Sequence, residues 1–460
     1  MKEFDTICAV STSVGVGGIS IIRLSGPNAV SIIKKIFRDK DGKDITEFIN
    51  YTLKYGYIHR INSDEILDEV LVSFMKGPKS FTAEDVIEIN THGGAFVTNR
   101  ILEETIRAGA RLAERGEFTK RAFLNGRIDL TQSEAINDII NAETDSSVKA
   151  AIYQSKGIIS EKIKSLRDKI LLLVANIEAT VDYPEEDLEE VTAYDGIIKI
   201  RELKSEINDL IESFDEGKII RDGLNAVIIG KPNVGKSSLL NMLLNENRAI
   251  VTEIPGTTRD IIEEHINLDG ILVKLTDTAG IRDTNDIIEK IGVEKSKERI
   301  KEADLIILVF DRSSYITKED VDIIKNIKDK NFIILLNKSD LNEDKLNIDS
   351  IEELKGKKII NISAKYGEGI DSLKNQIKDM FFSNELEISA HGITNIRHKE
   401  ALIKANESLV AAIDTLENVS AVDLASIDLK NAYLSLGEIT GESTSEDIIN
   451  KIFEKFCLGK

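Results

Sequence analysis

Cysteine, histidine and long apolar runs are all scarce in this sequence. The 460-residue chain has two cysteines, Cys8 and Cys457, near opposite ends and no Cys-x-x-Cys pair. Neither a disulfide framework nor a cysteine zinc site is therefore expected, and the five histidines show no metal-ligand spacing. No apolar stretch approaches the length that spans a bilayer, and no basic start precedes one. We expect a cytoplasmic protein with no membrane span.

Positive charge is also in short supply. The formal net charge is −20, which argues against a broad basic surface for nucleic acid or for an anionic membrane. The net charge is −1 over residues 1–120, −9 over 121–222, −4 over 223–382 and −6 over 383–460. With 42% hydrophobic and 30% charged residues, the composition is that of a soluble globular chain. A local basic patch remains compatible with these values.

The N-terminal part, residues 1–119, alternates strand-like and helix-like segments. Strands are predicted at residues 19–24, 69–74 and 86–89, and helices at residues 28–37 and 97–109. This mixture predicts an α+β domain.

Two helical segments, residues 120–222 and 383–460, flank a region of different character. The first contains apolar residues at spacings of three and four that predict one buried stripe: Ile163, Leu166, Ile170, Leu173 and Ile177. Residues 223–382 contain continuous apolar runs at 225–229, 305–310 and 332–336, as fully buried parallel strands require. We therefore expect a doubly wound α/β domain inserted into an all-helical domain.

A phosphate-binding loop follows the first of these apolar runs. Residues 230–237 read Gly-Lys-Pro-Asn-Val-Gly-Lys-Ser and match G-x-x-x-x-G-K-[ST] between a predicted strand and a predicted helix at 238–244. Its glycines let backbone N–H groups surround phosphates, Lys236 can reach the β- and γ-phosphates, and Ser237 can ligate magnesium.

Four further motifs follow in the order of a GTPase. Gly256-Thr257-Thr258-Arg259-Asp260 offers a threonine to magnesium, and Asp277-Thr278-Ala279-Gly280 offers a carboxylate to magnesium and an amide to the γ-phosphate. Asn337-Lys338-Ser339-Asp340 offers a carboxylate to the N1 and N2 hydrogens of guanine, which adenine lacks, and Ser363-Ala364-Lys365 forms a loop over the base. Any one of these motifs alone could equally be an ordinary turn. The five in order predict a P-loop GTPase domain of the Ras-like type.

One expected residue of Ras-type GTPases is missing. Ile281 stands where those proteins carry a glutamine that orients the attacking water, and isoleucine cannot do this. Another group must take that role, and Glu289 and Glu294 lie downstream.

Over its whole length the chain resembles one family, the tRNA-modifying GTPases MnmE, also called TrmE. The resemblance rests on the phosphate loop and Gly-Thr-Thr-Arg-Asp, and on N-terminal Gly-Gly-Ile at 17–19 and Ile-Arg-Leu-Ser-Gly-Pro at 22–27. Asp-Leu-Thr-Gln-Ser-Glu-Ala at 129–135 and the terminal Phe-Cys-Leu-Gly-Lys at 456–460 complete it. The G domains of related assembly factors share the first two motifs and lack the termini.

The resemblance implies a GTPase that is activated when two G domains meet around potassium. It assigns magnesium to Ser237 and Thr258, and catalysis to Glu289, Lys236 and Thr258, with Glu289 placing the water. It assigns potassium to Asn233, Thr252, Ile254 and Thr257. The GTP-binding residues predicted from motifs and resemblance together are Asn233, Val234, Gly235, Lys236, Ser237, Ser238, Thr252, Glu253, Ile254, Pro255, Gly256, Thr257, Thr258, Asp277, Thr278, Ala279, Gly280, Asn337, Lys338, Asp340, Ser363, Ala364 and Lys365.

The resemblance also implies that residues 1–119 form a folate-binding dimerisation domain. Arg23, Glu88, Arg127 and Lys460 match its contacts to 5-formyltetrahydrofolate, since a carboxylate suits pterin N–H donors and a cation suits the glutamate tail. Cys457 is either a thiol for the modification chemistry or a small buried apolar residue, and both readings stay open.

The function implied is addition of an aminomethyl or carboxymethylaminomethyl group to C5 of the wobble uridine of certain tRNAs. The implied assembly is a homodimer with an FAD-dependent, MnmG-type partner. Because the chain is acidic, we expect it to hold tRNA weakly alone and the partner to supply most of the basic surface. The alternatives are a ribosome-assembly GTPase that binds RNA without chemistry and a folate-dependent aminomethyl transferase regulated by GTP.

Overall fold

The computed structural model describes residues 5–13, 15–182, 189–247, 263–277, 299–341, 345–348, 351–354, 356–382, 392–418 and 422–460. The chain divides into two compact units. The first comprises Met1–Asn137, Gln154–Ile197 and Glu407–Lys460, and the second comprises Asp138–Tyr153 and Ile198–Asn406. The domain boundaries near residues 120, 223 and 383 stay a prediction. Among the described helices, none is long and apolar enough to cross a membrane.

The first unit begins with a seven-stranded sheet in the order β3-β4-β5-β6-β2-β1-β7, antiparallel except between β1 and β7. Its strands are β1 Ile7–Val10, β2 Ile19–Ser25, β3 Phe37–Asp39, β4 Leu53–His59, β5 Ile66–Met75, β6 Val86–His92 and β7 Arg111–Leu112. The three strands predicted from the sequence are confirmed as parts of β2, β5 and β6. The other four were not predicted, because they are short or carry mixed polar and apolar residues.

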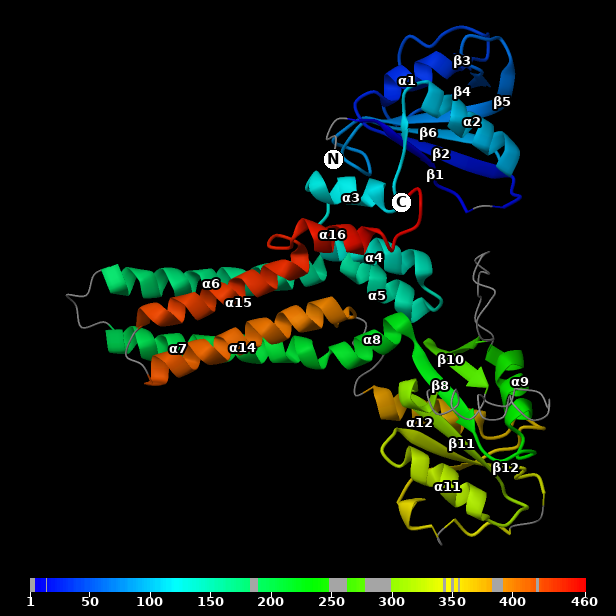
Figure 1. Cartoon of the computed structure of the whole chain (residues 1–460), viewed down its shortest axis with the longest axis vertical. Helices are drawn as coiled ribbons and strands as arrows, with labels where there is room; N and C mark the ends of the chain where they lie inside the picture. The colour runs from blue at the N-terminus through cyan, green and yellow to red at the C-terminus, as the bar shows by residue number, and fades with distance from the viewer. Residues whose placement is uncertain are drawn as a thin grey trace. The chain divides into compact units, whose positions relative to one another are not determined.

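Two helices, α1 Ala29–Ile36 and α2 Ala95–Arg107, contribute to the apolar core on one face of this sheet (Figure 1). Both confirm predicted helices. Alternate strand residues such as Ile22, Leu24 and Val72 point into that core. A smaller cluster, which includes Ile7 and Phe118, lies on the opposite face beneath α3 Glu117–Leu124. Over β4 and β5 that opposite face stays open, with Leu53, Tyr55 and Leu71 exposed.

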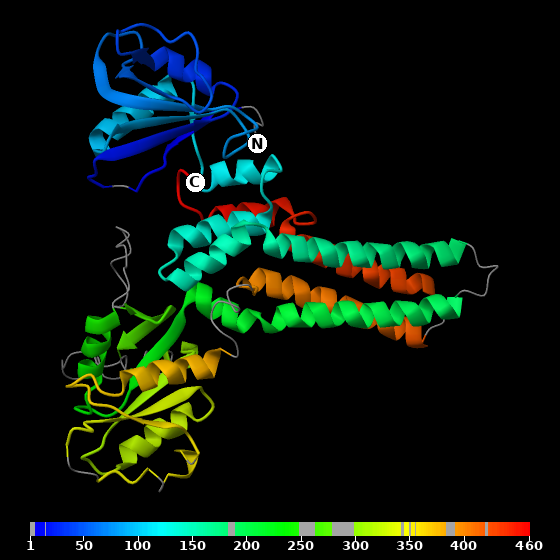
Figure 2. The ribbon, with the colours of Figure 1, turned by 180° about the vertical axis from the view of Figure 1, so that it is seen from behind.

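The helical part of the first unit contains the predicted buried stripe. Helix α6 Ile158–Asp182 runs beside α15 Val422–Thr440 in both views (Figures 1 and 2). The five apolar residues of the stripe are all buried, so this prediction is confirmed. Helix α16 Glu446–Phe453 packs against α3 through phenylalanines, with Phe123, Phe453 and Phe456 in contact.

Five further described helices have residues in both units or belong to the second. They are α4 Leu130–Asn141, α5 Asp145–Ser155, α7 Glu189–Glu212, α8 Phe214–Asp222 and α14 Ile396–Asn418. Within the second unit, Ala150 of α5, Ile220 of α8 and Phe382 form a small apolar cluster.

The second unit contains a six-stranded sheet in the order β13-β12-β11-β8-β10-β9, which is parallel except for the β9–β10 pair. The strands are β8 Leu224–Ile229, β9 Glu263–Leu268, β10 Ile271–Asp277, β11 Leu305–Asp311, β12 Phe332–Asn337 and β13 Ile359–Asn361. The helices of this region are α9 Lys236–Asn247, α11 Lys318–Ile327 and α12 Ile370–Phe381, with a short 3₁₀ turn at Glu352–Leu354. The three predicted parallel strands are confirmed as β8, β11 and β12.

Apolar cores lie on both faces of this second sheet. Ala226 and Ile228 of β8 point into one core, whereas Val227 and Ile229 point into the other. Burial on both faces explains why these strands read as continuous apolar runs. The fold class expected from the sequence, an α+β domain with helical and doubly wound α/β parts, is therefore the one observed.

Candidate nucleotide site and N-terminal ligand site

The phosphate-binding loop leaves β8 through backbone conformations that favour glycine. Gly230 has φ +151°, and a Cβ there would lie 2.4 Å from the Val309 carbonyl oxygen. Gly235 has φ +100°, and its Cβ would lie 2.1 Å from the Asn337 amide nitrogen. Both positions therefore require glycine. Asn233 is exposed between them and has φ +65°, a left-handed conformation that asparagine tolerates better than most residues.

The lysine of the phosphate-loop motif, Lys236, lies across its own loop. Lys236 opens α9 and donates from Nζ to the carbonyl oxygens of Gly230 and Lys231, each at 2.7 Å. Ser237 and Ser238 follow in the first helical turn and are exposed, whereas Val234 is buried beneath the loop. A helix N-terminus with an exposed hydroxyl in its first turn suits a phosphate with magnesium.

Asn337 links the phosphate loop to the loop Ser363-Ala364-Lys365, which is predicted to cover the base. Its side-chain amide donates to the Val234 carbonyl at 2.8 Å, and its side-chain oxygen accepts from the Ala364 N–H at 3.0 Å. Asn337 is buried, so both ends of the amide are paired inside the protein. The structure thus brings the first, fourth and fifth predicted motifs together.

The other residues of the base motif are held by local partners. Asp340 is exposed and accepts a hydrogen bond from the Ser363 hydroxyl at 2.7 Å. Lys338 forms an ion pair with Asp311 at 2.6 Å. Burial raises the pKa of Asp311, but hydrogen bonds from Lys338 and Ser313 outweigh it and hold the pKa below its usual range. Lys365 is exposed, and a hydrogen bond with Tyr366 raises its pKa.

Asp277 ends β10, as expected, and its backbone pairs with Ile228 of β8. This register places Asp277 at the carboxyl-terminal end of the parallel strands, where the phosphate loop follows β8. The other predicted site residues of the two middle motifs, of the proposed potassium loop and at position 289 lie outside the described residues: Thr252, Glu253, Ile254, Pro255, Gly256, Thr257, Thr258, Thr278, Ala279, Gly280 and Glu289.

In the N-terminal domain, two predicted folate contacts lie opposite each other. Arg23 of β2 pairs in register with Glu88 of β6, and its guanidinium contacts the carboxylate at 2.8 and 2.9 Å. The Arg23 guanidinium also lies 5.7 Å from the Phe81 ring centroid and 5.8 Å from that of Phe118.

Arg127, the third predicted contact, meets Arg23 at the same aromatic ring. Its guanidinium lies 5.1 Å from the Phe81 centroid, and Nη1 donates to the Phe81 carbonyl at 2.7 Å. Phe81 thus belongs to this cluster of side chains, although no motif in the sequence marks it.

The C-terminal segment lies against β1. The Gly459 carbonyl accepts from the Ser11 hydroxyl at 3.0 Å, and the Gly116 N–H donates to the Cys457 carbonyl at 3.3 Å. Gly459 has φ +85°, and a Cβ there would lie 2.2 Å from the Val10 carbonyl oxygen. Lys460 is thereby held at the end of β1. Cys457 is exposed, so the reading of it as a buried apolar residue is wrong.

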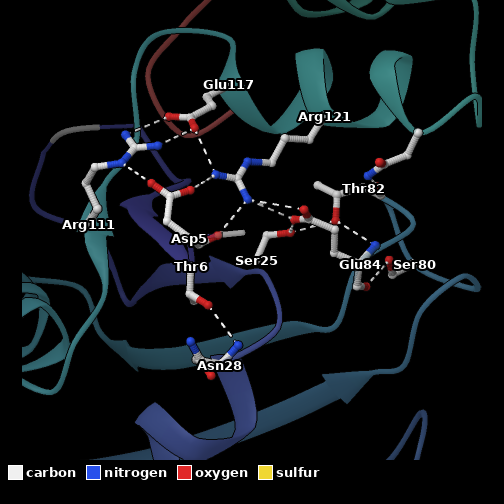
Figure 3. Close-up of polar contacts among 11 residues, drawn as sticks. Asp5, Thr6, Ser25, Asn28, Ser80, Thr82, Glu84, Arg111, Glu117 and Arg121 are labelled. Carbon is white, nitrogen blue, oxygen red and sulfur yellow. Dashed lines mark hydrogen bonds and ion pairs between the residues drawn. The ribbon is translucent and has the colours of Figure 1, made fainter. Parts of the chain in front are cut away.

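A cluster of charged residues fastens α3 to the N-terminal sheet (Figure 3). Arg121 of α3 contacts Asp5 at 2.6 Å, Glu117 at 3.0 Å and Glu84 at 3.2 Å, and Arg111 contacts Asp5 and Glu117 at 2.6 Å. Burial raises the pKa of Glu117, but hydrogen bonds from Arg111, the Glu114 N–H and Arg121 outweigh it and keep the carboxylate ionised. No local pattern marks this cluster, because Asp5 and Glu84 are far along the chain from Arg111, Glu117 and Arg121.

Two family models match the chain. One, described as the N-terminus of GTP-binding protein TrmE, matches residues 6–127, and the other, described as the MnmE helical domain, matches residues 130–457.

Curated relatives match the full length. A tRNA modification GTPase MnmE of Acetivibrio thermocellus is 52% identical over 100% of both chains. Proteins of the same name from Clostridioides difficile and Thermoanaerobacter pseudethanolicus are 50% and 51% identical, covering 99% of this chain and 99% and 100% of theirs.

Solved structures resemble a part of the chain. Era of Aquifex aeolicus bound to GDP and AlF₄⁻ is 29% identical, with a TM-score of 0.29, over 40% of this chain and 66% of Era. The G domain of the T. maritima FeoB iron transporter is 26% identical, with a TM-score of 0.26, over 34% of this chain and 97% of that domain.

Proposed function

Because the chain belongs to the MnmE family of tRNA modification GTPases, we propose that it hydrolyses GTP while modifying the wobble uridine of certain tRNAs. The observation that carries the GTPase part is the position of Asn337. One buried side chain bonds both the phosphate loop and the loop predicted to cover the base, so the two halves of a nucleotide site form one structure.

Magnesium and potassium fit the residues that are described. Ser237, exposed in the first turn of α9, would hold magnesium together with Thr258. Asn233 projects from the loop in a left-handed conformation and would offer its side-chain oxygen to potassium, completed by Thr252, Ile254 and Thr257. A potassium ion there would stabilise the negative charge that develops during phosphoryl transfer, and Glu289 would position the attacking water.

The folate proposal rests on the Arg23–Glu88 pair, on the face of the N-terminal sheet opposite its main core. Arg23, Glu88 and Arg127 gather around Phe81, and Gly459 holds Lys460 near the end of β1. A carboxylate and several cations beside an aromatic ring suit 5-formyltetrahydrofolate, with its pterin donors and its anionic tail.

The proposed partners are a second copy of this chain, an FAD-dependent MnmG-type protein and tRNA. The exposed Leu53, Tyr55 and Leu71 on the same sheet support contact with a second copy. The acidic chain supports a partner that supplies the basic surface for tRNA.

The whole function is tested in a strain that lacks this protein. Mass spectrometry of its tRNA should show wobble uridines without the C5 group, restored by wild-type protein and not by Lys236→Ala. Unchanged uridines in the deletion strain, together with a ribosome-assembly defect, would favour the alternative GTPase role.

Potassium activation has its own test at Asn233. Asn233→Ala should abolish the stimulation of GTP hydrolysis by potassium over sodium. Asn233→Gly is the control for backbone strain, because glycine accepts the left-handed conformation and also lacks the ligand. If either variant kept the potassium response, Asn233 would not be the ligand.

A further inference from the structure

Lys231, the second residue of the phosphate-binding loop, has a set of contacts to which the motif assigns no role. Its Nζ lies 2.7 Å from the carboxylate of Asp320 in the first turn of α11, where the Lys231 side chain is 14% exposed and that of Asp320 is 2% exposed. An ion pair so removed from water is held in one geometry, unlike an exposed pair.

Asp320 is fixed from a second direction. It is the acidic residue of a capping box, and it accepts hydrogen bonds from the Thr317 N–H at 2.8 Å and the Thr317 hydroxyl at 3.0 Å. The Lys231 ammonium also donates to the Thr317 hydroxyl at 3.3 Å. Asp320 and Thr317 at the N-terminus of α11 therefore form a fixed, negatively charged contact site for the Lys231 ammonium.

The backbone of the same lysine reaches the phosphate site. The Lys231 carbonyl accepts one of the two hydrogen bonds from Lys236 Nζ. A continuous set of bonds thus runs from α11 through Lys231 to Lys236, the lysine proposed to reach the phosphates.

The segment before α11 also contacts the motif Asn337-Lys338-Ser339-Asp340, which is predicted to bind the base. Asp311 pairs with Lys338 at 2.6 Å, and the Arg312 N–H donates to the Asn337 carbonyl at 3.1 Å. One stretch of chain, residues 311–320, thereby contacts the phosphate loop through Lys231 and the base motif through Lys338 and Asn337.

We propose that Lys231 is a positioning residue, which anchors the phosphate-binding loop to Asp320 and Thr317 of α11 so that Lys236 and the loop amides meet the nucleotide phosphates. This inference rests on the proposed GTPase function. Lys231 would then affect binding of the phosphates, whereas Asp340 would recognise the base.

The test measures GTP, GDP and ITP affinity of the full chain by competition with a fluorescent GDP analogue. Lys231→Met should weaken GTP and GDP about tenfold each, as expected for loss of a hydrogen bond to a charged group. The ratio of GTP to ITP affinity should not change, because ITP differs only in the base. Lys231→Arg should retain most of the affinity. Lys325→Met removes an exposed lysine from α11, the helix that contains Asp320, and should match wild type.

A double-mutant cycle separates the anchor from a general effect on folding. Asp320→Asn should also weaken GTP and GDP, and its combination with Lys231→Met should be no weaker than the single variants, since both remove the same pair. Additive losses would overturn the inference. So would a lower melting temperature with unchanged nucleotide affinity, because the pair would then stabilise only α11. Wild-type protein that fails to bind GTP would instead refute the proposed function.

Discussion

The two sheets of this protein bury their residues in different ways and build their sites in different places. The sheet of the second unit carries apolar cores on both faces, so its polar site residues lie in loops at the strand ends. The N-terminal sheet has its main core on one face, and Arg23 and Glu88 project from the middle of strands on the other. A sheet covered on both faces leaves only the loops at its strand ends for functional residues. A sheet with one face less covered can also place functional side chains in the middle of its strands.

The difference also shows in what each site is made of. Backbone carbonyls and glycine conformations shape the phosphate loop around Lys236. At the N-terminal site, guanidinium, carboxylate and aromatic side chains contact one another directly. We therefore expect the first site to be sensitive to backbone changes and the second to side-chain charge.

The largest expected effect tests the burial difference with one substitution in each sheet. Leu308→Ala in β11, where the side chain is 1% exposed, should lower the free energy of unfolding by about 2–5 kcal/mol, because it leaves a cavity. Leu71→Ala in β5, where the side chain is 42% exposed, should cost less than about 1 kcal/mol. Native-state hydrogen exchange of the two strands measures both. Equal losses would show that the N-terminal sheet face is covered in solution.

The next effect tests recognition of the base at a strand end. Asp340→Asn should weaken GTP binding about 30- to 100-fold, because guanine loses its charged acceptor, and should shift preference toward xanthine nucleotides. Competition binding with GTP and XTP measures the change. Weak binding of both nucleotides would point to a disturbed loop, since Asp340 also accepts from Ser363.

A smaller effect is expected at the Arg23–Glu88 pair of the N-terminal sheet. Arg23→Ala should weaken 5-formyltetrahydrofolate binding about tenfold and leave GTP affinity unchanged, because the change removes a cation from one site only. Isothermal titration with each ligand checks this. Lys40→Ala serves as the control, because it removes an exposed cation from the same domain. Unchanged folate binding would remove Arg23 from the proposed site.

The smallest effect concerns the two thiols. Burial raises the pKa of Cys8 to about 12, against a weaker opposite effect of Arg111, so this thiol stays protonated at neutral pH. Cys457 is exposed. A maleimide at pH 8 should label Cys457 within minutes and Cys8 only after unfolding, as mass spectrometry of tryptic peptides would show. Labelling of Cys8 in the folded protein would contradict its burial.

Local sequence predicted the second sheet and its site better than the first. Strands β8, β11 and β12 could be predicted because burial on both faces makes each a continuous apolar run, and the phosphate loop is a local motif. Strand β4 escaped prediction because Lys54, Tyr55 and Gly56 interrupt its apolar residues. The Arg23–Glu88 pair spans 65 positions and depends on strand register, which no local pattern encodes. The contact of Lys231 with Asp320 joins a loop to a helix far along the chain, which no local pattern encodes either.

The bond between Ser11 and Gly459 has a consequence for the order of events during synthesis. These residues are separated by 448 positions. At roughly 5–20 residues per second, about 20 to 90 seconds pass between their emergence from the ribosome. The N-terminal sheet must wait that long for the segment that completes it, and α6 must likewise wait for α15. The six described strands of the second sheet lie between Leu224 and Asn361, so this sheet can fold in that interval.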